Sequence, residues 1–216
     1  MSVIFEKGDI RVLFIHIPKT GGTSVRNLMI SEGWTALPNP DIPVTALASK
    51  ELNGPRNSNH QHEKLRREWV KTWDYEFTFV RNPYDRILSR AKQQARDLEI
   101  DEIKEINFFA WVDDILLRVL KEEGPGAEDN HHRPQHHFIS EDTAVFRIED
   151  QKEDFLKALR DRKIIGKSAL LGSFNQSLPD YKQIKKPNWK QQGLIHKDFL
   201  DIYREDFVKF GYEIIK

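Results

Sequence analysis

The sequence predicts an α/β fold, in which a parallel β-sheet is flanked by helices. Short apolar or β-branched runs at 12–17, 75–80 and 143–148 indicate strands. Helical patterns follow each of these runs, and strands that alternate with helices favour a parallel sheet with right-handed crossovers. The 216 residues contain no repeat and no low-complexity linker, so we expect a single domain over 1–216.

Composition excludes several classes of function. The chain has 34 Lys plus Arg and 34 Asp plus Glu, which gives a formal net charge of +0, so bulk charge supplies no reason to bind nucleic acid or an anionic membrane. It contains no cysteine, which excludes disulfides and thiolate chemistry. We see no signal peptide and no apolar stretch of membrane-spanning length, and we therefore expect a cytoplasmic protein without a membrane span.

The most informative stretch follows the first predicted strand. Two glycines, Gly21 and Gly22, remove side chains where a bound group would approach the backbone. Val25, Leu28 and Met29 then begin a helix, whose first N–H groups are unpaired and whose dipole adds partial positive charge. A lysine and three hydroxyl residues complete an anion site suited to phosphate or sulfate: Lys19, Thr20, Thr23 and Ser24.

The alternative interpretation of this stretch is a simple helix N-cap made by Thr23 or Ser24. The lysine and the paired glycines favour the anion site. The stretch is not the nucleoside-triphosphatase loop, since that pattern places its lysine after the second glycine, whereas Lys19 precedes both glycines.

A second strand also ends in a charged turn that opens a helix. Arg81 follows the strand 75–80, and Pro83 suits a first helical turn. Ligands bind beyond the carboxyl ends of parallel strands, so we expect Arg81 to hold a phosphate, with the Ser89 hydroxyl about two helical turns further on. The alternative is a structural ion pair of Arg81 or Arg86 with Asp85, and for Arg86 we favour that structural role.

The rest of the chain offers weaker signals. Residues 33–58 are predicted to be a long loop, and helices are predicted over 60–72, 108–120, 150–160 and 198–210, the last ending at Gly211. Four histidines within 131–137 suggest a metal site, but Pro134 interrupts any helix that would align them, so we favour contacts to substrate. The basic run at 182–190 indicates either a solvated face or a flap that closes on a phosphate.

The two turns together resemble those of the sulfotransferases that use PAPS (3′-phosphoadenosine 5′-phosphosulfate). Pro18-Lys-Thr-Gly-Gly-Thr-Ser24 is similar to their phosphosulfate loop, and Phe79-Val-Arg-Asn-Pro-Tyr-Asp-Arg-Ile-Leu-Ser89 is similar to their other phosphate-binding element. Three further stretches resemble the branch that contains carbohydrate sulfotransferases and many bacterial relatives: His132-Arg-Pro-Gln135, Phe146-Arg-Ile-Glu149 and the segment 203–212.

This resemblance implies a P-loop-like sheet and transfer of a sulfuryl group from PAPS to a hydroxyl acceptor, expected to be a carbohydrate, with PAP as the product and no metal. Lys19 would stabilise the leaving group, Arg81 and Ser89 would hold the 3′-phosphate, and His60 or His62, with His60 preferred, would be the base. The 5′-phosphosulfate would be cradled by Thr20, Gly21, Gly22, Thr23 and Ser24. We further assign Lys185 and Lys186 to the donor, and His132, Arg133 and His136 to the acceptor.

Two other functions stay open at this point. The first is an ATP-dependent phosphotransferase that uses the same loop. Such an enzyme would need magnesium, and it would not explain the presence of Arg81 and Ser89. The second is a binding domain without catalysis, against which the presence of both Lys19 and Arg81 argues. His16, in the first predicted strand, is interpreted as a core histidine, and the sequence leaves the oligomeric state open.

Overall fold

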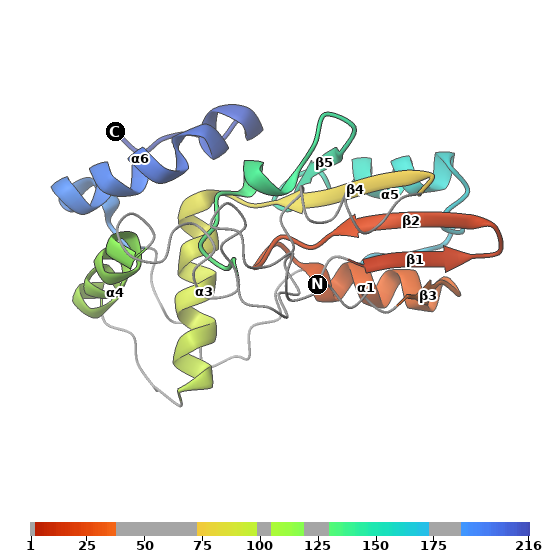
Figure 1. The fold of residues 1–216 in the computed structure, drawn as a ribbon, viewed down its shortest axis with the longest axis horizontal. Coiled ribbons are helices and arrows are strands. Elements are labelled where there is room, and N and C mark those ends of the chain that lie inside the picture. The colour runs from red at the N-terminus through yellow and green to blue at the C-terminus, as the bar shows by residue number, and fades with distance from the viewer. Residues whose placement is uncertain (1–2, 38–72, 99–104, 119–129, 173–186) are drawn as a thin grey trace, which may run out of the picture.

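A mixed β-sheet forms the right-hand part of the structure in Figure 1, a computed structural model that describes residues 3–37, 73–98, 105–118, 130–172 and 187–216. Within these residues the sheet has five strands in the order β3-β1-β2-β4-β5. The strands are β1 (Val3–Lys7), β2 (Ile10–Ile15), β3 (Thr35–Ala36), β4 (Tyr75–Val80) and β5 (Ala144–Arg147).

The three predicted strands are present and parallel. β2 pairs with β4 and β4 pairs with β5, with Ile15 opposite Thr78 and Val80 opposite Arg147. The boundaries of β4 are those predicted, whereas β2 ends at Ile15, so His16 follows the strand and does not lie inside it. Parallel neighbouring strands have their carboxyl ends at the same end of the sheet, so the turns that follow β2 and β4 lie close together.

The prediction of a parallel sheet is wrong for the side of the sheet that is formed by β1 and β3. β1 pairs antiparallel with both β2 and β3, and a tight turn at Gly8, which has a φ of 61°, joins β1 to β2. The buried side chains of Val3 and Phe5 alternate with partly exposed ones along β1, which is the pattern of a strand with one face on the core. Such hairpins need only a short turn, whereas parallel neighbours need a long crossover.

Two helices cover the same face of the sheet. α1 (Gly22–Ser31) contributes Val25, Leu28 and Met29 to one apolar cluster, and α5 (Lys152–Asp161) contributes Phe155, Leu156 and Leu159. The strand side chains in this cluster include Phe14, Phe77 and Phe79. Alternate strand residues point to the opposite face, where Leu13 and Ile15 pack against Phe138 and Ile139.

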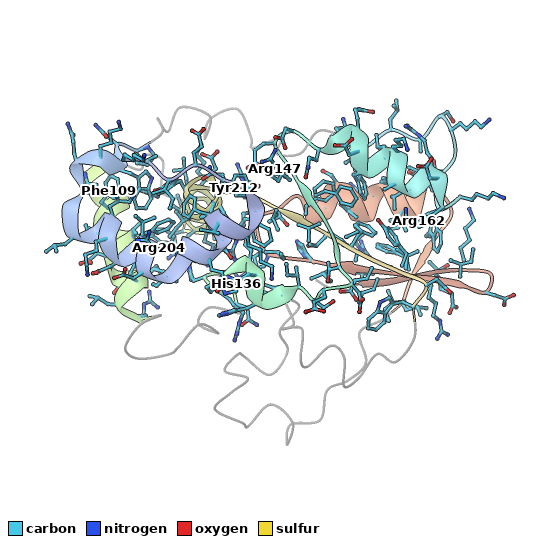
Figure 2. All side chains as sticks on the ribbon, turned by 90° about the horizontal axis from the view of Figure 1, so that it is seen from above. Phe109, His136, Arg147, Arg162, Arg204 and Tyr212 are labelled. Carbon is cyan, nitrogen blue, oxygen red and sulfur yellow. The ribbon has the colours of Figure 1, made fainter. Side chains whose placement is uncertain are left out.

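A second apolar cluster lies beyond the carboxyl ends of β2 and β4, on the left of Figure 1. It joins α3 (Pro83–Asp97), α4 (Glu105–Leu117) and α6 (Gly193–Phe210), and Trp189 of the 3₁₀ turn Trp189–Gln191 is buried in it. A further 3₁₀ turn, Gln135–Phe138, contacts α6. Tyr84 of α3 stacks on Phe199 of α6 at 5.3 Å between ring centroids. In Figure 2, Phe109 lies within this helical part and Arg162 at the far end of the sheet.

Local signals explain where the helices begin and end. The side chain of Asn82 caps α3 by accepting from the Tyr84 N–H at 3.0 Å, and Pro83 occupies the first turn as predicted. α6 ends at Gly211, whose φ of 68° is the left-handed conformation of a helix stop, also as predicted. None of the helices in the described ranges is long and apolar enough to cross a membrane.

Candidate functional site

The turn after β2 has the geometry of an open helix start. Lys19 and Gly21 both have positive φ, 68° and 87°, and Gly21 is the N-cap residue of α1 without any side-chain cap bond. Thr23 and Ser24 therefore lie inside the first helical turn, and neither caps the helix. The Thr20 hydroxyl, which is fully buried, donates to the Ile17 carbonyl at 2.8 Å and closes the turn. The N–H groups of Gly22 and Thr23 lack intrahelical acceptors and point out of the helix start.

His16 explains why position 22 is a glycine. A Cβ atom added to Gly22 would lie 2.1 Å from Nε2 of His16, far inside van der Waals contact. The His16 ring stacks on Phe14 with centroids 5.7 Å apart. The ring therefore packs directly against the backbone that begins α1. His16 is half-buried there, so it is not the fully buried core histidine expected from the sequence.

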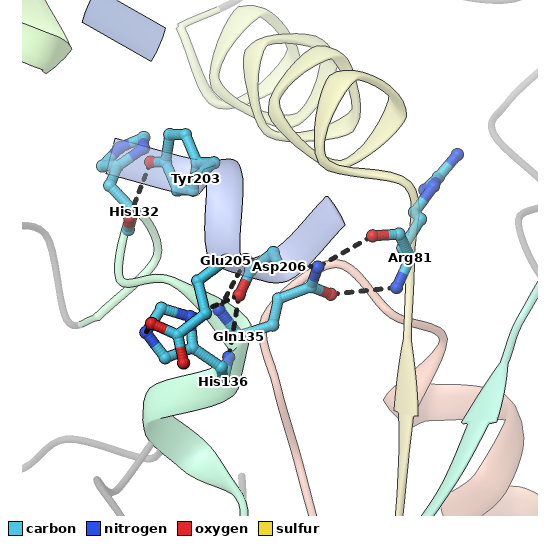
Figure 3. Close-up of polar contacts among 7 residues, drawn as sticks. All are labelled: Arg81, His132, Gln135, His136, Tyr203, Glu205 and Asp206. Atoms are coloured by element: carbon cyan, nitrogen blue, oxygen red, sulfur yellow. Dashed lines mark hydrogen bonds and ion pairs between the residues drawn. The ribbon is translucent and has the colours of Figure 1, made fainter. Parts of the chain in front are cut away.

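The turn after β4 is held by side chains from distant segments. The Gln135 side chain accepts from the Arg81 N–H at 2.9 Å and donates to the Arg81 carbonyl at 2.8 Å. The next N–H, of Asn82, donates to Glu149 at 2.8 Å, and Glu149 also accepts from the Tyr212 hydroxyl at 2.8 Å. Figure 3 shows the guanidinium of Arg81 pointing away from Gln135.

The two turns touch. The Arg81 guanidinium donates to the carbonyl of Lys19 at 3.3 Å. The Lys19 ammonium donates to the Gln93 side chain of α3 at 2.9 Å. Among the described residues no carboxylate lies within ion-pair distance of Arg81, so the structural pair with Asp85 is not formed there. Ser89, which is half-buried, lies on the same helix as Gln93.

The electrostatics of this junction favour an anion. The pKa of Lys19 is lowered from 10.5 to about 8, first by burial and then by Arg96, Arg81 and Arg90, while Asp97 opposes the shift. Burial also lowers the pKa of Arg81. Several cations gathered around one partly buried ammonium repel one another, and a bound phosphate or sulfate would relieve that repulsion.

Arg86 has a structural role, as predicted, but its partners among the described residues are backbone carbonyls and not the predicted carboxylate of Asp85. Arg86 is 4% exposed, and its guanidinium donates to the Pro18 carbonyl at 3.1 Å and to the His131 carbonyl at 3.0 Å. One buried side chain of α3 thus ties the turn after β2 to the histidine-rich segment.

That segment, 131–137, is packed against α6. His132 is buried, its carbonyl accepts from the Tyr203 hydroxyl at 2.6 Å, and its ring meets Trp111 edge-on. Arg133 is buried too, donates to Asn130 at 2.8 Å and has its pKa lowered by burial to about 10. His136 contacts Asp206 and Glu205 through its two ring nitrogens, at 2.7 and 3.2 Å. The proposed acceptor roles of His132, Arg133 and His136 stay predictions.

Several predicted residues cannot be placed. His60, His62, Lys185 and Lys186 lie outside the described residues, as do the predicted helix over 60–72 and most of the loop over 33–58. In the part of the chain that the structure describes, no three His, Asp or Glu side chains are grouped to hold a metal ion.

Sequence reasoning missed four residues that lie at this site or support it: Gln93, Arg96, Gln135 and Asp206. A signal existed for the first two, because they stand four and seven residues after Ser89, which places all three on one face of a helix. Gln135 and Asp206 lie in two of the stretches that resemble the family, but no role was predicted for them. They reach the site from segments more than 50 residues away from Arg81, so no pattern beside Arg81 indicates their roles.

Comparison with known proteins agrees with this geometry. Family models match residues 3–213 to the sulfotransferase family, a span that includes both turns. No curated protein and no solved structure matches the chain significantly. As the two turns and their separation predicted, the chain belongs to the sulfotransferase family, whose members are transferases that move a sulfuryl group.

Proposed function

We propose that this protein transfers the sulfuryl group of PAPS to the hydroxyl group of an acceptor, with a carbohydrate as the first acceptor to test. The observation that carries the proposal is the contact between the two turns, where Arg81 donates to the Lys19 carbonyl at 3.3 Å. The turn that carries the Lys19 ammonium and the turn that carries the Arg81 guanidinium therefore meet beyond two adjacent parallel strands, and the charge of Arg81 acts on Lys19. PAPS carries its two anionic groups at opposite ends of one ribose, which suits such a pair.

We assign the 5′-phosphosulfate end of PAPS to the turn after β2. The open N–H groups of Gly22 and Thr23 and the Lys19 ammonium supply hydrogen bonds and positive charge. The remaining residues of this cradle are Thr20, Gly21 and Ser24. Since the Thr20 hydroxyl already closes the turn, its contribution is to the shape of the cradle.

We assign the 3′-phosphate to Arg81 and Ser89. A guanidinium binds a phosphate through two parallel N–H donors, which makes it suitable for recognising this group. The 3′-phosphate distinguishes PAPS from ATP, so this assignment also argues against the phosphotransferase alternative. Lys185 and Lys186 are proposed to contact the donor as well.

The reaction balances without a metal. The acceptor oxygen attacks sulfur, the bond between sulfur and the bridging oxygen breaks, and the electron pair stays on the 5′-phosphate of PAP. Lys19 stabilises the charge that develops on that leaving oxygen, as positioned cations do in phosphoryl transfer. The acceptor proton passes to a base, for which His60 or His62 is proposed, because histidine titrates near neutral pH.

We assign binding of the hydroxyl acceptor to the segment 131–137. The burial of His132 and Arg133 favours an indirect contribution of these two residues, through the shape of the segment, with His136 nearer the surface.

The direct test is transfer of ³⁵S from labelled PAPS to a panel of sugars, lipids and small alcohols. We expect a labelled sulfate ester with at least one carbohydrate, unaffected by EDTA, and no transfer by Lys19→Ala. Asn in place of the true base, His60 or His62, should abolish turnover while PAP still binds. Phosphate transfer from labelled ATP that needs magnesium would support the phosphotransferase, and PAP binding without any transfer would support a silent binding domain.

A further inference from the structure

We propose that Gln135, anchored by Asp206, is a positioning residue that aims Arg81 at the 3′-phosphate of the donor. This inference rests on the proposed function, in which Arg81 holds that phosphate. It assigns to a buried amide an effect on nucleotide selectivity, although the amide itself does not touch the ligand.

The backbone of Arg81 lies just beyond the hydrogen-bonded pairing of β4 with β5. The last paired residues of β4 and β5 are Val80 and Arg147, so Arg81 follows directly after the ladder. The Gln135 amide supplies the two hydrogen bonds that a neighbouring strand would otherwise make, at 2.9 Å to the N–H and 2.8 Å to the carbonyl. Two bonds to one residue fix the orientation of its backbone, and hence the direction in which its side chain leaves.

Asp206 fixes Gln135 in turn (Figure 3). One carboxylate oxygen of Asp206 accepts from the backbone N–H of Gln135 at 2.8 Å. The other oxygen accepts from the backbone N–H of His136 at 2.9 Å and from its ring Nδ1 at 2.7 Å. Asp206 and Gln135 both have 0% exposed surface. Hydrogen bonds to a buried carboxylate are among the strong ones, so this contact is rigid.

The anchor belongs to the apolar core of the helical part. Asp206 lies on α6 between Tyr203 and Phe207, both of which are buried in the cluster with Phe199 and Tyr84. Packing of α6 therefore determines where Asp206 lies, Asp206 determines where Gln135 lies, and Gln135 determines the backbone of Arg81. The guanidinium is left to point away from this chain of contacts, toward the Lys19 turn.

A purely structural role for Gln135 predicts something different. If the amide only holds the segment 131–138 in place, its loss would lower the affinity of the site for every ligand to the same extent. If it aims Arg81, its loss would weaken only the part of the affinity that depends on the 3′-phosphate. AMP differs from PAP only in lacking that phosphate, so the ratio of the two affinities isolates it.

The experiment measures dissociation constants of PAP and AMP by calorimetry for the wild type, Gln135→Met, Arg81→Ala and the double variant. Methionine keeps the length of the side chain and removes both hydrogen bonds. We expect wild type to prefer PAP by roughly tenfold or more, as for a charge-assisted pair. We expect Gln135→Met to lose most of this preference, and to cause no further loss of preference in the Arg81→Ala background.

A second variant covers the case in which Gln135→Met does not fold. Gln135→Asn keeps a neutral amide, and so places no second charge near the Asp206 carboxylate, which lies 3.5 Å from the Gln135 side chain, but its shorter side chain cannot reach both backbone groups of Arg81, and the same loss of preference is expected. Equal weakening of PAP and AMP, or an unchanged preference in the folded variants, would overturn the inference while the role of Arg81 stands. A wild type that binds PAP and AMP equally would overturn the inference together with the assignment of Arg81.

Discussion

The surroundings of the Lys19 ammonium determine its pKa, and with it the charge that Lys19 presents to a ligand. Burial and three arginines lower its pKa to about 8, whereas a bound dianion would raise it, because opposite charge favours the protonated form. PAP binding should therefore take up a proton above pH 8. We expect the dissociation constant of PAP to rise about tenfold between pH 7 and pH 9, measured by calorimetry, since one pKa unit corresponds to a factor of 10.

Lys19→Arg is the matched control, because a guanidinium stays protonated throughout this range. Its PAP affinity should be independent of pH between 7 and 9, and the PAP phosphates are already ionised there. A wild-type profile as flat as that of Lys19→Arg would contradict the assignment of Lys19 to the anion. Folding stability should show the opposite sign: the unfolded chain holds the Lys19 proton up to about pH 10.5, so this residue's destabilising effect fades as pH rises from 8.

Single residues also show what the sequence could predict at the site. Lys19 and Arg81 were predicted as site residues because each stands beside a local signal, a glycine pair after a strand and an Asn-Pro helix start. Gln93 has only its helical spacing from Ser89, and Asp206 has no such neighbour. Gln93 contacts a residue 74 positions away and Asp206 one 71 positions away, and such pairs follow from the packing of helices, which a single sequence does not reveal.

At the scale of elements, the start of α1 depends on the space between Gly22 and His16. We expect Gly22→Ala to lower the free energy of unfolding by about 1–3 kcal/mol, the usual cost of overpacking, and to weaken PAP binding, because the new methyl group and the His16 ring cannot both keep their places. Urea unfolding and calorimetry measure the two effects.

The double variant His16→Ala/Gly22→Ala tests the cause. It frees the space that the methyl group needs, so PAP affinity should return toward that of His16→Ala alone. If the second substitution restores nothing, the steric explanation of Gly22 is wrong.

Elements with strong local chemistry were predicted well. β4 alternates and is rich in aromatic residues, α3 has an Asn-Pro start, and α6 has a glycine stop. The bounds of β4, the start of α3 and the end of α6 therefore agree with the structure, whereas α6 begins at Gly193 and not at the predicted residue 198. β1 was missed, although Gly8 separates two short apolar runs as a hairpin turn does. A strand of five residues at the N-terminus gives little periodicity, and its antiparallel pairing depends on a turn too short to stand out.

At the scale of the whole molecule, the site lies where two cores meet. One core joins the sheet to α1 and α5, and the other joins α3, α4 and α6. Arg86 ties the two together by binding the carbonyls of Pro18 and His131. The donor site therefore depends on how the helical part is seated on the sheet.

We expect Arg86→Met to lower the free energy of unfolding by about 2–5 kcal/mol, because buried acceptors are left without a donor, and to weaken PAP binding as well. Arg204→Met, on the exposed side of α6, is the control and should change the free energy of unfolding by less than about 0.5 kcal/mol. Urea denaturation of both variants measures the difference. Similar small effects from the two substitutions would show that Arg86 does not link the cores.

The family assignment and the contact between the two turns lead to one central claim, that a single nucleotide spans both turns. A crystal structure of the protein with PAP tests it most directly. We predict the 5′-phosphate about 3 Å from the backbone nitrogens of Gly22 and Thr23 and from the Lys19 ammonium, and the 3′-phosphate on the Arg81 guanidinium. PAP bound away from either turn, or Arg81 paired with a carboxylate while PAP is bound, would contradict the claim.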